Sequence, residues 1–200
     1  MKKFFLLIVA VVAALCISAC ASGPKVSRES SQEDLSGYWN NNDVKIVCSD
    51  LIDQCLNSKT IIAAYAKEQR VLRVMVGTFR NESDEHINTS IISSTMEITL
   101  DNSGIFRFVE GGEAREQLRA ERQDQLYNAS EATAPELGME TAADYILTGS
   151  VKSSVDRAGN RTSRSYMVRA ELTDIETNER VWSGMNTDIN KTVVNPSAKW

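Results

Sequence analysis

The sequence predicts an α/β fold in which helices pack against a single mixed β-sheet. Its first half alternates amphipathic helices with short apolar strands, an order typical of neighbouring parallel strands. Its second half, from residue 144, holds three strands separated by turn residues, which favours antiparallel pairing. The expected order is helix, strand, helix, strand, two helices and three strands. Hydrophobic residues make up 42% of the 200 residues, enough to form the core of one domain.

Residues 1–19 have the pattern of a signal peptide. Two lysines precede an apolar stretch, residues 4–15, which is shorter than the roughly 20 residues that a membrane-spanning helix needs. The ending ISAC resembles a bacterial lipobox, which implies that Cys20 is lipidated and begins the mature chain. Ala21 follows instead of Asp, and by analogy with enterobacterial sorting this favours the outer membrane, facing the periplasm. The alternative is an ordinary secretory signal in which Cys20 is incidental.

The mature chain divides into a tether, a domain and a tail. Residues 20–34 carry the anchor and a flexible linker that reaches about 50 Å when extended. Residues 35–189 form the α/β domain, and the polar residues 190–200 are expected to drape over it or fray. At the start of the domain, Tyr38 and Trp39 are interpreted as an entry point packed on the domain edge, with a sugar-binding pair as the alternative.

The early elements follow from hydrophobic spacing. A clean helical stripe predicts the first helix, with Asn42 and Asp43 as caps and with Val44, Val47, Cys48, Leu51, Ile52 and Cys55 buried. Residues 61–67 fit either a short helix or an extended connection. The apolar run 71–76, bounded by Gly77, predicts a strand buried on both faces. A polar turn over 80–86 and a helix over 87–100 follow.

The later elements are marked by glycines and alternation. Residues 105–109 predict a strand, and the charged stretch 113–127 predicts a helix that packs weakly at the surface. A further helix is expected within 130–143. Strands are then expected at 144–151, 166–173 and 180–183, with a hairpin turn at 158–160 between the first two.

Catalytic and metal-binding patterns are missing from the sequence. His86 is the only histidine, and no Gly-x-Ser-x-Gly nucleophile motif occurs. A structural metal site usually needs several His or Cys ligands. The net charge of −5 argues against binding to nucleic acid, which needs a basic face. We therefore expect no enzyme activity, no cofactor, no metal and no small-molecule substrate.

Two cysteines remain after processing. Cys48 and Cys55 lie two turns apart on the first helix, so their Cα atoms are about 10 Å apart and cannot form a disulfide with each other. They are interpreted as core positions, with pairing between chains left open.

Charged side chains in two loops are the candidate partner contacts. The polar turn and the predicted hairpin supply them: Asp84, Glu85, His86, Arg157, Arg161 and Arg164. The default for such residues is a solvated loop, and the functional alternative is a contact with a charged patch on another protein.

Eight short segments in order resemble the LpoB family of penicillin-binding-protein activators. They include SGYWN at 36–40, QCLN at 54–57, VGTFRNESDEHINT at 76–89, NSGIFRFV at 102–109, RAERQDQ at 119–125, ADYILTG at 143–149 and IETNERVW at 175–182. The resemblance implies a fold similar to the TolB amino-terminal domain. It also implies a non-catalytic lipoprotein that binds and activates a class A penicillin-binding protein, a peptidoglycan synthase. The tether is shorter than the family's, so such a partner would have to extend toward the outer membrane. The rival interpretation is a structural or assembly lipoprotein of the secretion-linked CsgG-like type.

Overall fold

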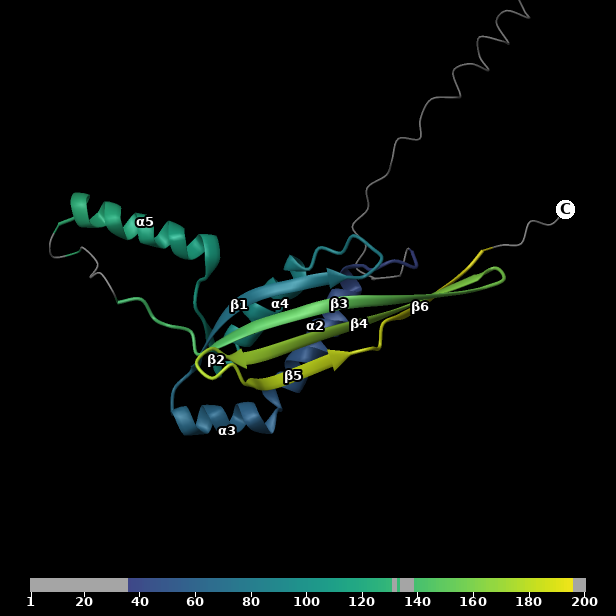
Figure 1. Cartoon of the computed structure of the whole chain (residues 1–200), viewed down its shortest axis with the longest axis horizontal. Coiled ribbons are helices and arrows are strands. Elements are labelled where there is room, and N and C mark those ends of the chain that lie inside the picture. The colour runs from purple at the N-terminus through teal and green to yellow at the C-terminus, as the bar shows by residue number, and fades with distance from the viewer. Residues whose placement is uncertain (1–35, 131–132, 134–138, 196–200) are drawn as a thin grey trace, which may run out of the picture. The chain divides into compact units, whose positions relative to one another are not determined.

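A computed structural model describes residues 36–130, 133 and 139–195 (Figure 1). The predicted lipidation site Cys20, the tether and half of the helix expected within 130–143 lie outside these residues. Four helices and six strands are described, in the order α2 (Asn41–Leu56), α3 (Lys59–Glu68), β1 (Leu72–Glu82), α4 (Ser90–Asp101), β2 (Phe106–Phe108), α5 (Gly112–Asn128), β3 (Tyr145–Ala158), β4 (Arg161–Asp174), β5 (Arg180–Asn186) and β6 (Asn190–Val194).

The strands form one mixed sheet, which confirms the predicted fold class. The order is β2-β1-β3-β4-β5, and β6 pairs with β4 beyond the end of β5. The pairs β1–β2 and β1–β3 are parallel, whereas β3–β4, β4–β5 and β4–β6 are antiparallel. Helices α2 and α4 contact each other, and they contact β5 and β1 respectively, so they cover the same face of the sheet (Figure 1). The predicted likeness to TolB stays a prediction.

Helix α2 matches its prediction closely. All six apolar positions of the predicted stripe are buried. The helix begins earlier than expected, because Asn40 is the N-cap and forms a capping box with Asp43. The ambiguous segment 61–67 belongs to a helix, α3, of which Ile61 is the buried residue.

Strand β1 differs from its prediction in two ways. It is buried on one face only, because Leu72 and Val74 are buried while Arg73 and Met75 are partly exposed. It also continues past Gly77 to Glu82, through half of the predicted polar turn. A register shift between Val76 and Phe79 accommodates the glycine, so the strand bulges there instead of ending.

The end of the domain also differs. Residues 190–194 were expected to form part of a polar tail, and they form β6 instead. The sequence of this strand, NKTVV, gives no apolar alternation that would predict it, because its one buried side chain is the charged Lys191. Helix α5 has no buried residue, as its charge predicted. Residues 139–143, the described end of the helix expected within 130–143, have no regular structure.

Candidate functional site

The polar loop after β1 is held by the carboxylate of Glu85. Its Oε1 accepts hydrogen bonds from the Tyr166 hydroxyl at 2.5 Å and from Arg164 Nη1 at 2.9 Å. Its Oε2 accepts one from the Trp39 backbone N–H at 3.1 Å. Three segments that are far apart in sequence therefore meet at one side chain. The side chains of Glu85 and Arg164 are only 11% and 12% exposed, so this ion pair is largely buried at the edge of the domain.

Asp84 extends this arrangement toward solvent. Its carboxylate accepts hydrogen bonds from Arg164 at 2.7 Å and from the Ser153 hydroxyl at 2.6 Å. These two donors, Ser153 first, hold the pKa of Asp84 below its ordinary value. His86, the next residue but one, is exposed.

The aromatic pair at the chain entry packs on the same edge. Trp39 meets Tyr166 edge to face, with ring centroids 5.3 Å apart. The guanidinium of Arg164 lies over the Tyr38 ring, 4.7 Å from its centroid. These contacts support the packing interpretation of Tyr38 and Trp39 over the sugar-binding alternative, because Trp39 and the cation-facing side of Tyr38 are engaged within the domain.

The three arginines near the β3–β4 hairpin do not form one patch. Cross-strand pairing joins Arg157 to Thr162 and Arg164 to Val155, while Arg161 faces Ala158. Because side chains alternate along a strand, Arg157 and Arg164 lie on one face of the hairpin and Arg161 lies on the other. Arg157 and Arg161 are exposed, whereas Arg164 turns inward to Asp84 and Glu85. Their role as partner contacts stays a prediction.

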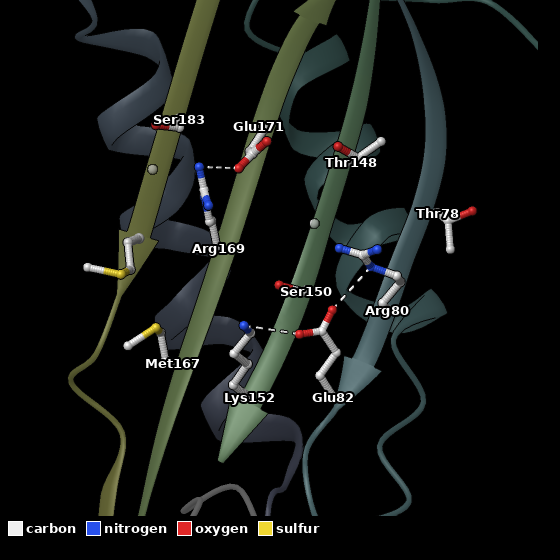
Figure 2. Close-up of a pocket in the computed structure, with 13 residues that line it drawn as sticks. Thr78, Arg80, Glu82, Thr148, Ser150, Lys152, Met167, Arg169, Glu171 and Ser183 are labelled. Atoms are coloured by element: carbon white, nitrogen blue, oxygen red, sulfur yellow. Dashed lines mark ion pairs between the residues drawn. The ribbon is translucent and has the colours of Figure 1, made fainter. Parts of the chain in front are cut away.

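A concave region lies on the sheet face opposite α2 and α4. It has a volume of about 640 Å³, and its lining side chains come from four adjacent strands, β1, β3, β4 and β5. Figure 2 shows hydroxyl groups of Thr148 and Ser150 along its centre. Charged groups surround that centre: Arg80 and Glu82 on β1, Lys152 on β3, and Arg169 and Glu171 on β4.

Sequence reasoning did not select this concavity. The alternation of Met167, Arg169 and Glu171 with buried residues showed only that these side chains point away from the core. Which strands lie beside them is decided by the strand order, and the sequence pattern of one strand carries no signal for that.

The two cysteines of the described residues are buried, and these residues form neither a metal-binding cluster nor a membrane-spanning helix. Among the described residues, no group of three or more His, Cys, Asp or Glu side chains could hold a metal ion. Within the same ranges, no helix has both the length and the apolar character to cross a membrane. Cys48 and Cys55 are free and buried, and burial raises the pKa of each thiol to about 12.

Several solved structures are similar to this chain. The C-terminal domain of LpoB from Escherichia coli is 17% identical and has a TM-score of 0.44, covering 76% of this chain and 99% of that one. The LpoB C-terminal domain from Salmonella enterica is 19% identical with a TM-score of 0.42, covering 72% and 97%. Lipoprotein GNA1162 from Neisseria meningitidis is 18% identical with a TM-score of 0.40, covering 64% and 88%. None of the curated proteins matches the sequence.

The family assignment comes from the domain itself. The family model described as peptidoglycan-synthase activator LpoB matches residues 43–187. That match runs from the first turn of α2 to the end of β5, and so includes the Glu85 loop, the hairpin and the concave sheet face. It covers well over half of the sequence. The chain therefore belongs to the LpoB family.

Proposed function

We propose that this protein is a lipid-anchored, non-catalytic regulator that binds and activates a class A penicillin-binding protein. The observation that carries the proposal is the family match over residues 43–187, which spans nearly all of the described domain. The lipobox-like sequence at Cys20 supports an outer-membrane anchor facing the periplasm. The family is one of activators, which supports a regulatory role without catalysis of its own.

Activation requires that binding discriminates between two states of the synthase. The protein shifts the synthase toward its active conformation only by as much as it binds that conformation more tightly. The six candidate contacts differ in how they could take part. His86, Arg157 and Arg161 are exposed and could touch a partner directly. Asp84, Glu85 and Arg164 would act by holding the loop and the chain entry in place.

Reconstitution tests the proposal. The full-length lipoprotein, purified in detergent, is mixed with the class A penicillin-binding protein of the same bacterium and a lipid-linked disaccharide-peptide substrate. We expect direct binding and faster glycan polymerisation by the synthase, and no polymerisation by the lipoprotein alone. A synthase that neither binds the lipoprotein nor changes its rate would overturn the proposal.

A further inference from the structure

The strand register lines up polar side chains on the open face of the sheet. Arg80 on β1 pairs with Ser150 on β3, and Ser150 pairs with Arg169 on β4. Arg169 pairs in turn with Met185 on β5. These four residues therefore form one row across four strands, and their side chains line the same concavity. Neighbouring strands lie about 4.8 Å apart, so the Cα atoms of Arg80 and Arg169 are roughly 10 Å apart.

Each of the two arginines in this row belongs to an ion-pair cluster with one cation in excess. Glu82 pairs with Arg80 at 3.2 Å and with Lys152 at 3.2 Å. On the other side, Glu171 pairs with Arg169 and, at 3.3 Å, with Arg180. Figure 2 shows both clusters, apart from Arg180. The four cations face only two carboxylates, so this face has a positive surplus on a chain whose net charge is −5.

The cations are accessible to a partner. The side chains of Arg80 and Arg169 are 70% and 44% exposed. Two exposed methionines, Met167 and Met185, lie beside them and offer an adaptable apolar contact. Among the described residues, no aromatic ring lines the concavity, so stacking on a sugar ring contributes nothing there. These features favour a protein partner over a glycan.

We infer that the open face, defined by Arg80, Lys152, Arg169, Arg180 and the row between them, binds an acidic segment of the partner protein. This inference rests on the proposed function, so the partner is the class A penicillin-binding protein. The segment presents two carboxylates, one for each cluster. Each arginine has the planar donor fork that matches a carboxylate. Its present ion pair is exposed and contributes little free energy, so the arginine can exchange that carboxylate for one of the partner at little cost.

Charge variants on the full-length lipoprotein test the inference. The double variant Arg80→Glu/Arg169→Glu reverses both clusters. The double variant Arg80→Gln/Arg169→Gln neutralises both arginines without placing a negative charge beside Glu82 or Glu171, in case charge reversal disturbs the fold. As a matched control, Lys45→Glu/Lys59→Glu makes the same charge change on exposed helical positions. Binding to the synthase is measured at low and at physiological salt, and thermal unfolding confirms that each variant is folded.

Removal of the cations should weaken binding to the synthase, and removal of the carboxylates should strengthen it. Both arginine variants should weaken binding to the synthase by about tenfold or more, with much of the change in the association rate and a shallower salt dependence. Glu82→Gln/Glu171→Gln raises the surplus and should strengthen binding severalfold, whereas the lysine control should bind like the wild type.

Two failures can be told apart. If the wild type binds the synthase and the folded arginine variants bind it equally well, the inference about this face is wrong and the proposed function stands. If the wild type does not bind the synthase, the proposed function is wrong, and the assignment of this face to that partner falls with it.

Discussion

Lys191 on β6 makes a buried ion pair whose loss should destabilise the whole domain. Its Nζ lies 2.6 Å from Asp43 Oδ2 and donates a hydrogen bond to the Tyr38 carbonyl at 2.9 Å. The side chains of Lys191 and Asp43 are only 7% and 3% exposed. Asp43 also belongs to the capping box of α2, so this pair joins the last described strand to the first described helix and to the chain entry.

Lys191→Met keeps most of the aliphatic side chain and removes the charge. Asp43 then stays buried without its cation, and breaking a buried pair in this way costs about 3 to 5 kcal/mol of unfolding free energy. For a domain of this size, that lowers the melting temperature by about 6 to 20 °C. Lys45→Met on the exposed side of α2 should change the unfolding free energy by less than about 0.5 kcal/mol.

Urea and thermal unfolding of the chain lacking residues 1–20 measure both effects. A second variant separates lost packing from the stranded charge: Asp43→Asn/Lys191→Met keeps an oxygen for the cap and removes both charges. It should be more stable than Lys191→Met alone, because no charge is left buried without a partner. If Lys191→Met lies within about 1 kcal/mol of the wild type, the reasoning is refuted.

Three further predictions follow from the described contacts. The pKa of Asp84 is lowered in the folded state. Its contribution to stability is therefore present above its ordinary pKa of about 3.9 and is lost as pH falls through the lower folded value. In Asp84→Asn, the urea concentration at the unfolding midpoint should change less with pH in that acidic range. Gly149→Ala should cost about 1 to 3 kcal/mol, measured by urea unfolding, because the new Cβ would collide with the Phe79 ring and the Arg169 carbonyl. Gly159→Ala in the hairpin turn meets no atom within 4 Å, so its cost reports only the strain of an alanine at a φ of +59°. Cys48 and Cys55 should not react with a thiol reagent near pH 8 until the protein unfolds, and rapid labelling of the folded chain would contradict their burial.

The sequence predicted helices better than strand ends. The stripe of α2 is complete because six apolar residues recur at helical spacing on one face, and their burial follows from that geometry alone. The predicted strand ends at Gly77, since a glycine after an apolar run is typical of a strand end, whereas β1 continues to Glu82. Its continuation depends on pairing between Glu82 and Lys152, on a strand that begins more than 60 residues later.

The side-chain partners of the candidate contacts could not be predicted from the sequence. The residues Asp84, Glu85 and Arg164 were selected as loop charges, and the structure joins them to one another and to the chain entry. Arg80 and Arg169 were not selected, because an exposed arginine on a half-buried strand looks the same in sequence whether or not a second arginine lies two strands away.

By itself, the sequence determined the fold class, the α2 core stripe and the family signature. These depend on local spacing and on short motifs, which are read along the chain without knowing what folds against it. Only the tertiary structure decided that Glu85 accepts hydrogen bonds from residues 46, 79 and 81 positions away, that Lys191 is buried, and that two cationic clusters share one open face. The physical reason is that pairing energies between distant side chains depend on strand order and register, which are set by the packing of the whole sheet.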